Sequence, residues 1–311
     1  MNPDWLLKHF EQISEAPDAV PRLRRFILDL AVRGRLVDQD PADEPASELL
    51  KRIEAEKERL VKEGEIKKPE VFQTVADDEL PFSIPSGWCA MRMGWLARKL
   101  GAGSTPLGGK SVYQDEGIPF LRSQNIHDDG LQLEDVALIT RTVHDRMSGT
   151  HIQDQDILLN ITGASIGRCA LVPSSLGEGN VSQHVAIIRL FVPAIREFIH
   201  LSLISPSYQK LIMDVQVGVS REGLSMQRLR LFPMLIPPLA EQHRIAAKVD
   251  ELMALCDELE GTQAKRERQR DRLVAATLRG LNNGNGSSEP GVHPTFEESA
   301  HFYFNHLPRL T

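Results

Sequence analysis

The stretch LIPPLAEQHRIAAKVDELMALCDELE, residues 235–260, decides how this chain is organised. After Pro237 and Pro238, apolar residues recur at steps of four, three, four and three, the spacing of the a and d positions of a coiled coil. These residues are Ile245, Val249, Leu252, Cys256 and Leu259. The spacing predicts a helix from about residue 240 to about residue 279, some 60 Å long at about 1.5 Å per residue. Because such a helix has a single apolar stripe, we expect it to pack against the first segment of this chain or a second copy.

The region before residue 80 predicts two helices. Apolar residues at helical spacing begin at Leu23 and stop before Gly34, and a connector rich in Pro and Asp follows. A second helix is predicted to begin at Ser47 as its N-cap and to end at Gly64. Its buried face should hold Leu49, Leu50, Ile53, Lys57 and Leu60.

Residues 80–236 differ from the first segment in the pattern of their apolar residues. Short apolar runs such as IPFL (118–121), DILLNI (156–161) and HVAIIRLFV (184–192) alternate with polar turns and predict short strands, and residues 195–216 predict helix. The expected fold class is α+β: one globular domain flanked by helical regions, the C-terminal one a long coiled-coil-forming helix. The expected segments are an N-terminal helical region (1–79), the central domain (80–236), a spacer or dimerisation helix (237–280), and a flexible linker and tail (281–311).

Composition and charge indicate which classes of protein this chain can belong to. No window of the 311 residues approaches the about 18 continuous apolar residues of a membrane span, and the N-terminus lacks a secretory signal, so we expect a cytoplasmic protein without a membrane partner. The formal net charge is −7. Residues 80–236 nevertheless hold 14 Lys and Arg against 13 Asp and Glu. A DNA-binding role for this domain would therefore depend on a local patch or on basic partner chains.

Motifs for catalysis are missing from the sequence. There is no Asn/Asp-Pro-Pro-aromatic tetrapeptide of an adenine methyltransferase, and the glycine-rich loop 101–109 does not match a phosphate-binding loop. The three cysteines form no CxxC pair and the ten histidines form no HExxH motif, so no metal site is expected. His184, within the run VSQHVAII, is interpreted as a core or rim histidine rather than a general base.

Polar turns between the predicted strands favour a binding surface. Arginine, amide and hydroxyl side chains can bond to base edges or phosphates, and Arg168 could pair with guanine through two hydrogen bonds. Taken singly, each turn is an ordinary polar loop; together they favour a recognition surface. The candidate DNA-binding residues are Ser104, Thr105, Lys110, Arg122, Ser123, Gln124, Asn125, Asn160, Thr162, Ser165, Arg168, Asn180, Ser182, Gln183, Ser220 and Arg221.

Three stretches resemble the specificity subunits of type I restriction-modification systems. Residues 235–260 are similar to the PPLAEQ start of a long helix in that family, and residues 23–60 are similar to its other helical region. LLNITGASIGR and GNVSQHVAIIR, within residues 158–189, resemble a subtype of its target-recognition domain.

The resemblance implies a non-catalytic subunit that reads one half of a split DNA target in the major groove. It implies that the helical regions act as a spacer and dock methyltransferase and restriction subunits. S-adenosylmethionine, ATP and Mg²⁺ would then belong to those partner subunits, and no cofactor to this chain.

The chain departs from the family pattern because it has one recognition domain where a full subunit has two. Pro-Arg-Leu occurs at 21–23 and again at 308–310. We therefore expect either the first half of a longer subunit or a half-subunit that forms a homodimer. Two alternatives stay open: an assembly or regulatory protein that uses the helix without reading DNA, and a nuclease with a degenerate site.

Overall fold

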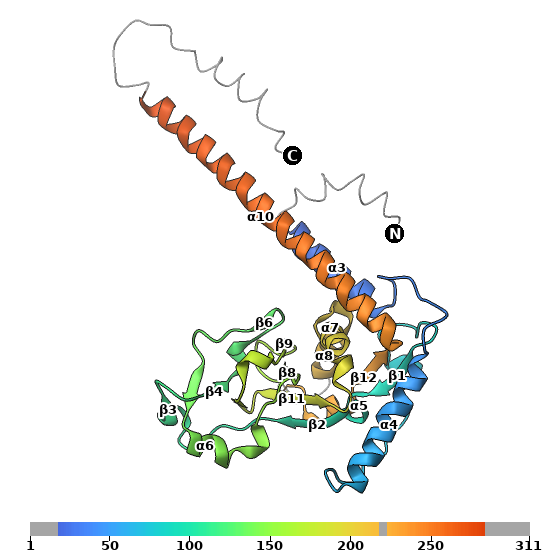
Figure 1. Ribbon diagram of the computed structural model, residues 1–311. Helices are drawn as coiled ribbons and strands as arrows, with labels where there is room; N and C mark the ends of the chain where they lie inside the picture. The colour runs from blue at the N-terminus through green and yellow to red at the C-terminus, as the bar shows by residue number, and fades with distance from the viewer. Residues whose placement is uncertain (1–17, 218–222, 284–311) are drawn as a thin grey trace, which may run out of the picture. The chain divides into compact units, whose positions relative to one another are not determined.

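The computed structural model describes residues 18–217 and 223–283. They form a mixed helix-and-strand fold, as predicted (Figure 1). The chain divides into two compact units, Met1–Glu258 and Leu259–Thr311. In the second unit the described residues, 259–283, belong to helix α10 (Leu239–Asn283). The segment limits expected at residues 79, 236 and 280 stay predictions, and the expected tail lies outside the described residues from 284 onward.

A four-stranded antiparallel sheet lies at the centre of the first unit (Figure 1). Its order is β2 (Ala97–Ala102), β11 (Val185–Leu190), β8 (Ile157–Asn160) and β9 (Cys169–Leu171). The two middle strands, β8 and β11, are almost wholly buried. Strands that are covered on both faces have continuous apolar sequences. This explains why the runs that predict these two strands show no alternation of apolar and polar residues.

Successive side chains of these middle strands enter two different cores, because neighbouring residues of a strand point to opposite faces. Ile157, Leu159 and Ile188 belong to the larger core. Leu158 and Ile187 belong to a smaller core on the other face. The sheet is therefore the layer on which the rest of the unit is built.

The smaller core is closed by a second four-stranded sheet and a hairpin. The order of this sheet is β10 (Asn180–Val181), β4 (Ile118–Leu121), β7 (Ala137–Ile139) and β3 (Tyr113–Gln114), with β10 parallel to β4. The hairpin pairs β5 (Ile126–His127) with β6 (Gly130–Leu131). Helix α6 (Arg141–Arg146) follows β7, and the Thr140 hydroxyl caps its first turn.

The larger core is covered by helices and a two-stranded sheet. The helices are α5 (Met93–Leu96), α7 (Arg196–Ile204), α8 (Pro206–Val217) and α9 (Met226–Leu231), and the sheet pairs β1 (Cys89–Arg92) with β12 (Pro233–Ile236). Tyr208 is fully buried there, and its hydroxyl oxygen accepts a hydrogen bond from the Leu235 amide (3.0 Å). Burial raises the pKa of this phenol.

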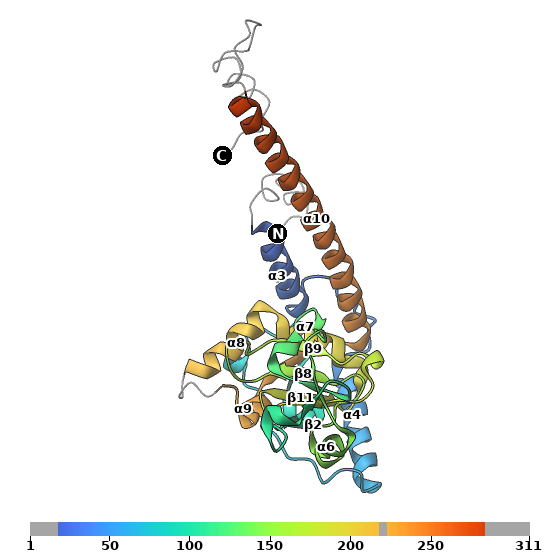
Figure 2. The same ribbon diagram turned by 90° about the vertical axis from the view of Figure 1, so that its left-hand side faces the viewer.

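The two predicted N-terminal helices, α3 (Ala19–Val32) and α4 (Ala46–Lys62), pack on this same core through residues such as Val32, Leu49 and Ile53. Figure 2 shows α3 next to α7 and α8. The glycine stops are confirmed, because Gly34 and Gly64 have φ angles of +64° and +74° just beyond the helix ends.

The predicted N-cap of α4 is wrong. The helix begins at Ala46, and its N-cap is Pro45, which makes no side-chain capping bond. Ser47 therefore lies inside the first turn. The apolar spacing located the helix correctly but could not fix its first residue.

Lys57 lies on the buried face of α4, as its spacing predicts. Its side chain is 2% exposed, and its Nζ lies 3.2 Å from the ring centroid of Trp95 and 3.4 Å from Oε2 of Glu54. Burial lowers the pKa of this amine to about 8, against the opposing effect of Glu54. Lys57 is thus a buried charge that is only partly compensated.

The predicted long helix is confirmed as α10, which is 45 residues long. Within the first unit its stripe residues Ile245, Val249 and Cys256 are buried, and Leu252 is half-buried. In the second unit Leu259 is half-buried.

Two ion pairs attach the first part of α10 to the N-terminal region. Arg244 Nη2 lies 2.5 Å from Asp43 Oδ2, and Arg24 Nη2 of α3 lies 2.5 Å from Asp257 Oδ1. The beginning of the helix is further held by Glu241, which is buried and accepts a hydrogen bond from the Trp88 indole (3.0 Å).

Candidate functional site

Four strand ends meet at one edge of the central sheet. In antiparallel pairs the end of one strand lies beside the beginning of its neighbour. The register places Ala186 opposite Ala102, and Val185 opposite Asn160. Strands β2 and β8 therefore end where β11 and β9 begin. The polar segments attached there form a surface that we call the loop end, which comprises residues 103–105, 161–168 and 182–184.

Backbone contacts fix the three segments of the loop end to one another. The Gly103 amide donates to the Val185 carbonyl (2.9 Å), and the Ile161 amide donates to the His184 carbonyl (3.0 Å). A Cβ atom on Gly103 would lie 2.1 Å from the Val181 carbonyl oxygen, which is far closer than atoms can approach. Only glycine lets this loop lie directly on its neighbour.

A chain of side-chain hydrogen bonds runs across the loop end. We call it the polar relay, and it consists of Thr105, Gln183, His184 and Thr162. The Thr105 hydroxyl is bonded to Oε1 of Gln183, and Gln183 Nε2 lies 3.1 Å from His184 Nε2. On the other side of the ring, His184 Nδ1 lies 2.6 Å from the Thr162 hydroxyl oxygen. Thr162 is half-buried and the other three residues are exposed, so the relay faces solvent.

His184 lies directly before β11, which begins one residue later, and its ring is exposed. Its predicted place inside the strand is therefore wrong, and of the two interpretations, core or rim, only the rim position fits. The available signal was its position directly after Ser182 and Gln183, which are themselves turn residues.

Arg168 is the exposed cation of the loop end. Both of its backbone polar groups are hydrogen-bonded. Its amide donates to the Ser165 carbonyl (3.1 Å), and its carbonyl accepts from the Asn160 amide (2.8 Å). Among the residues that the structure describes, no side-chain hydrogen bond or ion pair holds its guanidinium. A fixed backbone with an unengaged guanidinium suits the recognition of an anionic or acceptor-rich ligand.

Other candidates at this end of the sheet are buried. Asn160 has no exposed surface, and its Nδ2 donates to the Ser123 carbonyl (2.8 Å) and to the Ser165 hydroxyl (3.1 Å). Ser182 is 4% exposed. Within the described part of the chain, Asn160 Oδ1 and Ser182 Oγ have no hydrogen-bond partner. In this conformation these side chains position the turns, and their direct contact with DNA stays a prediction.

The segment Arg122–Asn125 lies next to the end of β8, where the Ser123 carbonyl accepts a hydrogen bond from Asn160 Nδ2. Asn125 is buried, and its side chain accepts from the Arg122 amide (3.0 Å) and donates to the Gln132 carbonyl (2.9 Å). Arg122 itself donates to the Asp135 carbonyl (2.9 Å) and is half-buried. Gln124 is the exposed member of this segment.

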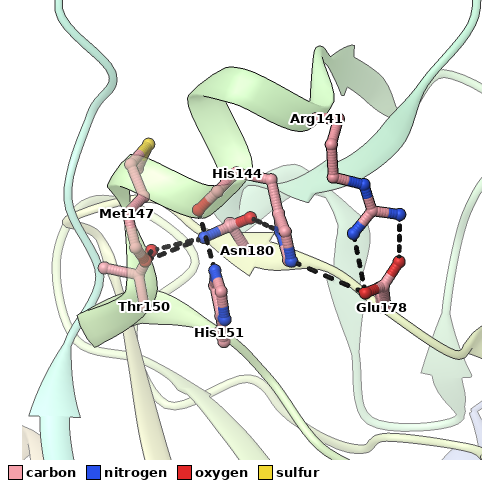
Figure 3. Close-up of polar contacts among 7 residues, drawn as sticks. All are labelled: Arg141, His144, Met147, Thr150, His151, Glu178 and Asn180. Carbon is pink, nitrogen blue, oxygen red and sulfur yellow. Dashed lines mark hydrogen bonds and ion pairs between the residues drawn. The ribbon is translucent and has the colours of Figure 1, made fainter.

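Asn180 lies in a separate buried cluster (Figure 3). Its Oδ1 lies 2.6 Å from His144 Nδ1, and its Nδ2 donates to the Met147 carbonyl (3.1 Å) and to the Thr150 hydroxyl (2.8 Å). The His144 ring stacks on the His151 ring, with centroids 3.8 Å apart. With both ends of its amide engaged, Asn180 fastens β10 to the α6 region in this structure, and its contact with DNA stays a prediction.

The rim of this cluster is an exposed ion pair. Arg141 forms two hydrogen bonds with Glu178, of 2.8 and 2.5 Å, and these lower the pKa of the Glu178 carboxyl (Figure 3). Such exposed pairs add little to stability.

Four candidates remain, and one of them, Ser104, lies in the loop end. Ser220, Arg221 and the side chain of Lys110 lie outside the described residues. Ser104 is exposed in the loop end, and its amide donates to the Val181 carbonyl (3.2 Å).

In the described parts of the chain, no three His, Cys, Asp or Glu side chains are grouped so that they could hold a metal ion. None of the helices described is long and apolar enough to cross a membrane.

The fold and the loop end thus define a mixed helix-and-strand domain with a polar surface at one edge of a buried sheet. Residues 85–267 match the family described as type I restriction modification DNA specificity domain. The chain belongs to this family.

Named relatives agree with this assignment. The chain is 32% identical over 257 residues to the type I restriction enzyme EcoAI specificity subunit of Escherichia coli, with 81% of this chain and 43% of the relative covered. It is 31% identical over 258 residues to the EcoEI specificity subunit of the same organism, with 81% and 43% covered. The chain therefore spans less than half the length of these relatives.

A solved structure shares the fold. A chain from a study of complex assembly and conformational transition of the type I R-M system superimposes with a TM-score of 0.50 at 17% identity. The match covers 90% of this chain and 59% of that chain.

Proposed function

We propose that this chain reads DNA sequence as the specificity subunit, or half of one, of a type I restriction-modification complex, and catalyses no reaction itself. The observation that carries the proposal is the loop end, where three polar segments fixed by backbone bonds surround the exposed Arg168. Membership of the DNA specificity family supports the same role.

Recognition would take place in the major groove, where each base pair presents a distinct set of donors and acceptors. Arg168 would pair with guanine, and the hydroxyl and amide groups of the polar relay would contact neighbouring base edges. Lys110, Ser220 and Arg221 stay candidates for contacts to bases or phosphates.

The helical regions would dock the methyltransferase and restriction subunits. S-adenosylmethionine, ATP and Mg²⁺ would be bound by those subunits, and the complex would act in the cytoplasm. The stripe from Ile245 to Leu259 would form a coiled coil that sets the distance between half-sites. The ion pair between Arg24 and Asp257 supports the pairing of α10 with α3.

One recognition domain would read one half of a split target. A full site would then need a second copy of this chain or a second half-subunit. Size-exclusion chromatography with light scattering tests the homodimer, which is wrong if the protein stays monomeric up to the highest accessible concentration.

The main experiment is methylome sequencing of cells that carry this chain with a type I methyltransferase subunit. We expect a split adenine-methylated motif. Arg168→Ala should relax one position of that motif, and the matched control Arg146→Ala, on the exposed face of α6, should leave the motif unchanged. Assembly of the complex without any specific methylation would instead favour an assembly protein that does not read DNA.

A further inference from the structure

With the Gln183 amide oriented as it is in this structure, the polar relay has one direction of hydrogen-bond donation. The Thr105 hydroxyl faces the Gln183 carbonyl oxygen, which can only accept, so Thr105 donates. The Gln183 amide nitrogen can only donate, so His184 Nε2 accepts. A neutral imidazole carries one N–H, which must then be on Nδ1 and point to Thr162.

This direction decides what the two ends of the relay offer to a ligand. Thr162 receives a hydrogen bond from the ring, and its own proton is free to donate outward. Thr105 uses its proton inward and offers only lone pairs. The loop end therefore presents a donor at Thr162 and an acceptor at Thr105.

Rotating the Gln183 amide by half a turn reverses every bond of the relay. The amide oxygen would then accept from His184 Nε2–H, and the amide nitrogen would donate to Thr105. The ring nitrogen Nδ1 would accept from Thr162. Thr105 would become the donor and Thr162 the acceptor, with no change in net charge.

Base edges distinguish these two patterns. A donor suits guanine O6, thymine O4 or a purine N7, whereas an acceptor suits the amino groups of adenine or cytosine. We propose that His184 is a positioning residue that, together with Gln183, fixes Thr162 as the hydroxyl that donates to DNA and Thr105 as the one that accepts. The proposal rests on the proposed DNA-reading function.

The surroundings hold the ends of the relay in place. Thr105 follows Gly103 and Ser104, whose amides donate to the Val185 carbonyl (2.9 Å) and to the Val181 carbonyl (3.2 Å). Thr162 follows Ile161, whose amide is bonded to the His184 carbonyl (3.0 Å). With both ends fixed, the relay can change its donor pattern only by rotating the amide and moving the ring proton.

The first test reads the ring proton directly. In the full chain with nitrogen-15-labelled histidine, long-range nitrogen–proton spectra distinguish the two ring nitrogens, and His184→Gln assigns the signal. We expect Nδ1 to carry the proton at neutral pH. Gln183→Glu offers only acceptors, so it should place a proton on Nε2 as well or instead. A wild-type ring protonated at Nε2 alone overturns the proposal.

The second test reads the consequence for DNA. The complex of the full chain with its methyltransferase selects from a pool of fully randomised duplex oligonucleotides. Thr162→Val should reduce discrimination about fivefold at a position where the base offers an acceptor, the effect of about one lost hydrogen bond. Thr105→Val should do so at a position where the base offers an amino group. The matched control Thr162→Ser keeps the hydroxyl and should keep the motif.

The outcomes distinguish a failure of the inference about His184 from a failure of the proposed DNA-reading function. If the wild-type complex enriches no motif, the proposed function fails, and the ring spectra still decide the relay. If the wild-type complex enriches a motif that both valine variants share unchanged, the function stands and the inference about His184 is wrong.

Discussion

Asn180 and Gln183 lie three residues apart and carry the same amide group, yet the fold uses them in opposite ways. Asn180 is fully buried, and its side chain is hydrogen-bonded to His144, Met147 and Thr150 (Figure 3). Gln183 is exposed and bonded to Thr105 and His184 in the polar relay. The sequence predicted one role for both. The difference shows that burial, more than residue type, separates a polar group that holds a loop from one that can meet a ligand.

The largest effect is expected from comparing a buried ion pair, Asp156 with Arg189, with an exposed one, Arg141 with Glu178. Asp156 has no exposed surface and accepts two hydrogen bonds from Arg189, of 2.7 and 2.8 Å. Removing one partner of a buried pair leaves the other charge uncompensated, so we expect Asp156→Ala to lower the free energy of unfolding by about 3–5 kcal/mol. Urea unfolding followed by circular dichroism measures this loss.

Arg141→Ala is the control for that experiment, because it breaks the exposed pair with Glu178. Its unfolding midpoint should stay close to that of the wild type. Equal losses in the two variants would remove the distinction between buried and exposed polar groups.

The two amides give the second comparison. Asn180→Ala leaves His144 Nδ1 without its partner and removes the hydrogen bonds to the Met147 carbonyl and the Thr150 hydroxyl. We expect a loss of about 2–3 kcal/mol in the free energy of unfolding. Gln183→Ala should change it by less than about 0.5 kcal/mol, as is usual for an exposed side chain. The same urea titration measures both. A larger loss for Gln183→Ala would mean that the relay holds the fold together.

The sequence predicted the helices from their apolar spacing and the middle strands from short continuous apolar runs. Helices α3, α4 and α10 and strands β8 and β11 were found in this way. The site was harder, because Asn180 and Gln183 stand in the same short stretch, GNVSQH, and nothing in it marks one amide as buried and the other as exposed. What separates them is the pairing of β10 with β4, which turns Asn180 inward, and such long-range pairing leaves no mark in a single sequence.

The contacts within the polar relay could not be predicted from the sequence either. Thr105, Thr162 and Gln183 were all named as candidates, but nothing in the sequence indicates that they touch through His184. Their contact depends on antiparallel register, which brings the ends of β2 and β8 beside the start of β11. The apolar run did not show that the strand begins at Val185, one residue after His184, and so could not decide between a core and a rim position for His184.

Two glycines extend the comparison to the backbone. A Cβ on Gly103 would meet backbone atoms of Val181 and Ser182 at 2.1–2.5 Å, whereas a Cβ on Gly101 would meet nothing within 4 Å. We expect Gly103→Ala to lower the free energy of unfolding by about 1–2 kcal/mol through forced displacement of the loop. Gly101→Ala should be close to neutral. Thermal unfolding of both variants measures the difference, and equal midpoints would contradict the close approach.

Lys57 is the case between the two extremes, a buried charge whose carboxylate partner, Glu54, is about half exposed. Burial lowers its pKa from 10.5 to about 8, so the unfolded chain binds more protons than the folded chain between these values. The free energy of unfolding should therefore rise with pH across this window because of Lys57. Below it the full penalty of burying the charge remains.

Lys57→Met keeps a long apolar side chain against Trp95 and removes the charge. At about pH 7 we expect it to raise the free energy of unfolding by on the order of 1 kcal/mol, since the lost cation–π contact offsets part of the gain. The advantage over the wild type should shrink as pH rises from about 8 toward 10.5, where the wild-type amine becomes neutral in both states. Urea titrations of both proteins across this range measure the difference, in which the shared effects of buried Tyr208 and the cysteines cancel. A difference that does not change with pH would mean that Lys57 stays protonated in the folded protein throughout the window, held by Trp95 and Glu54.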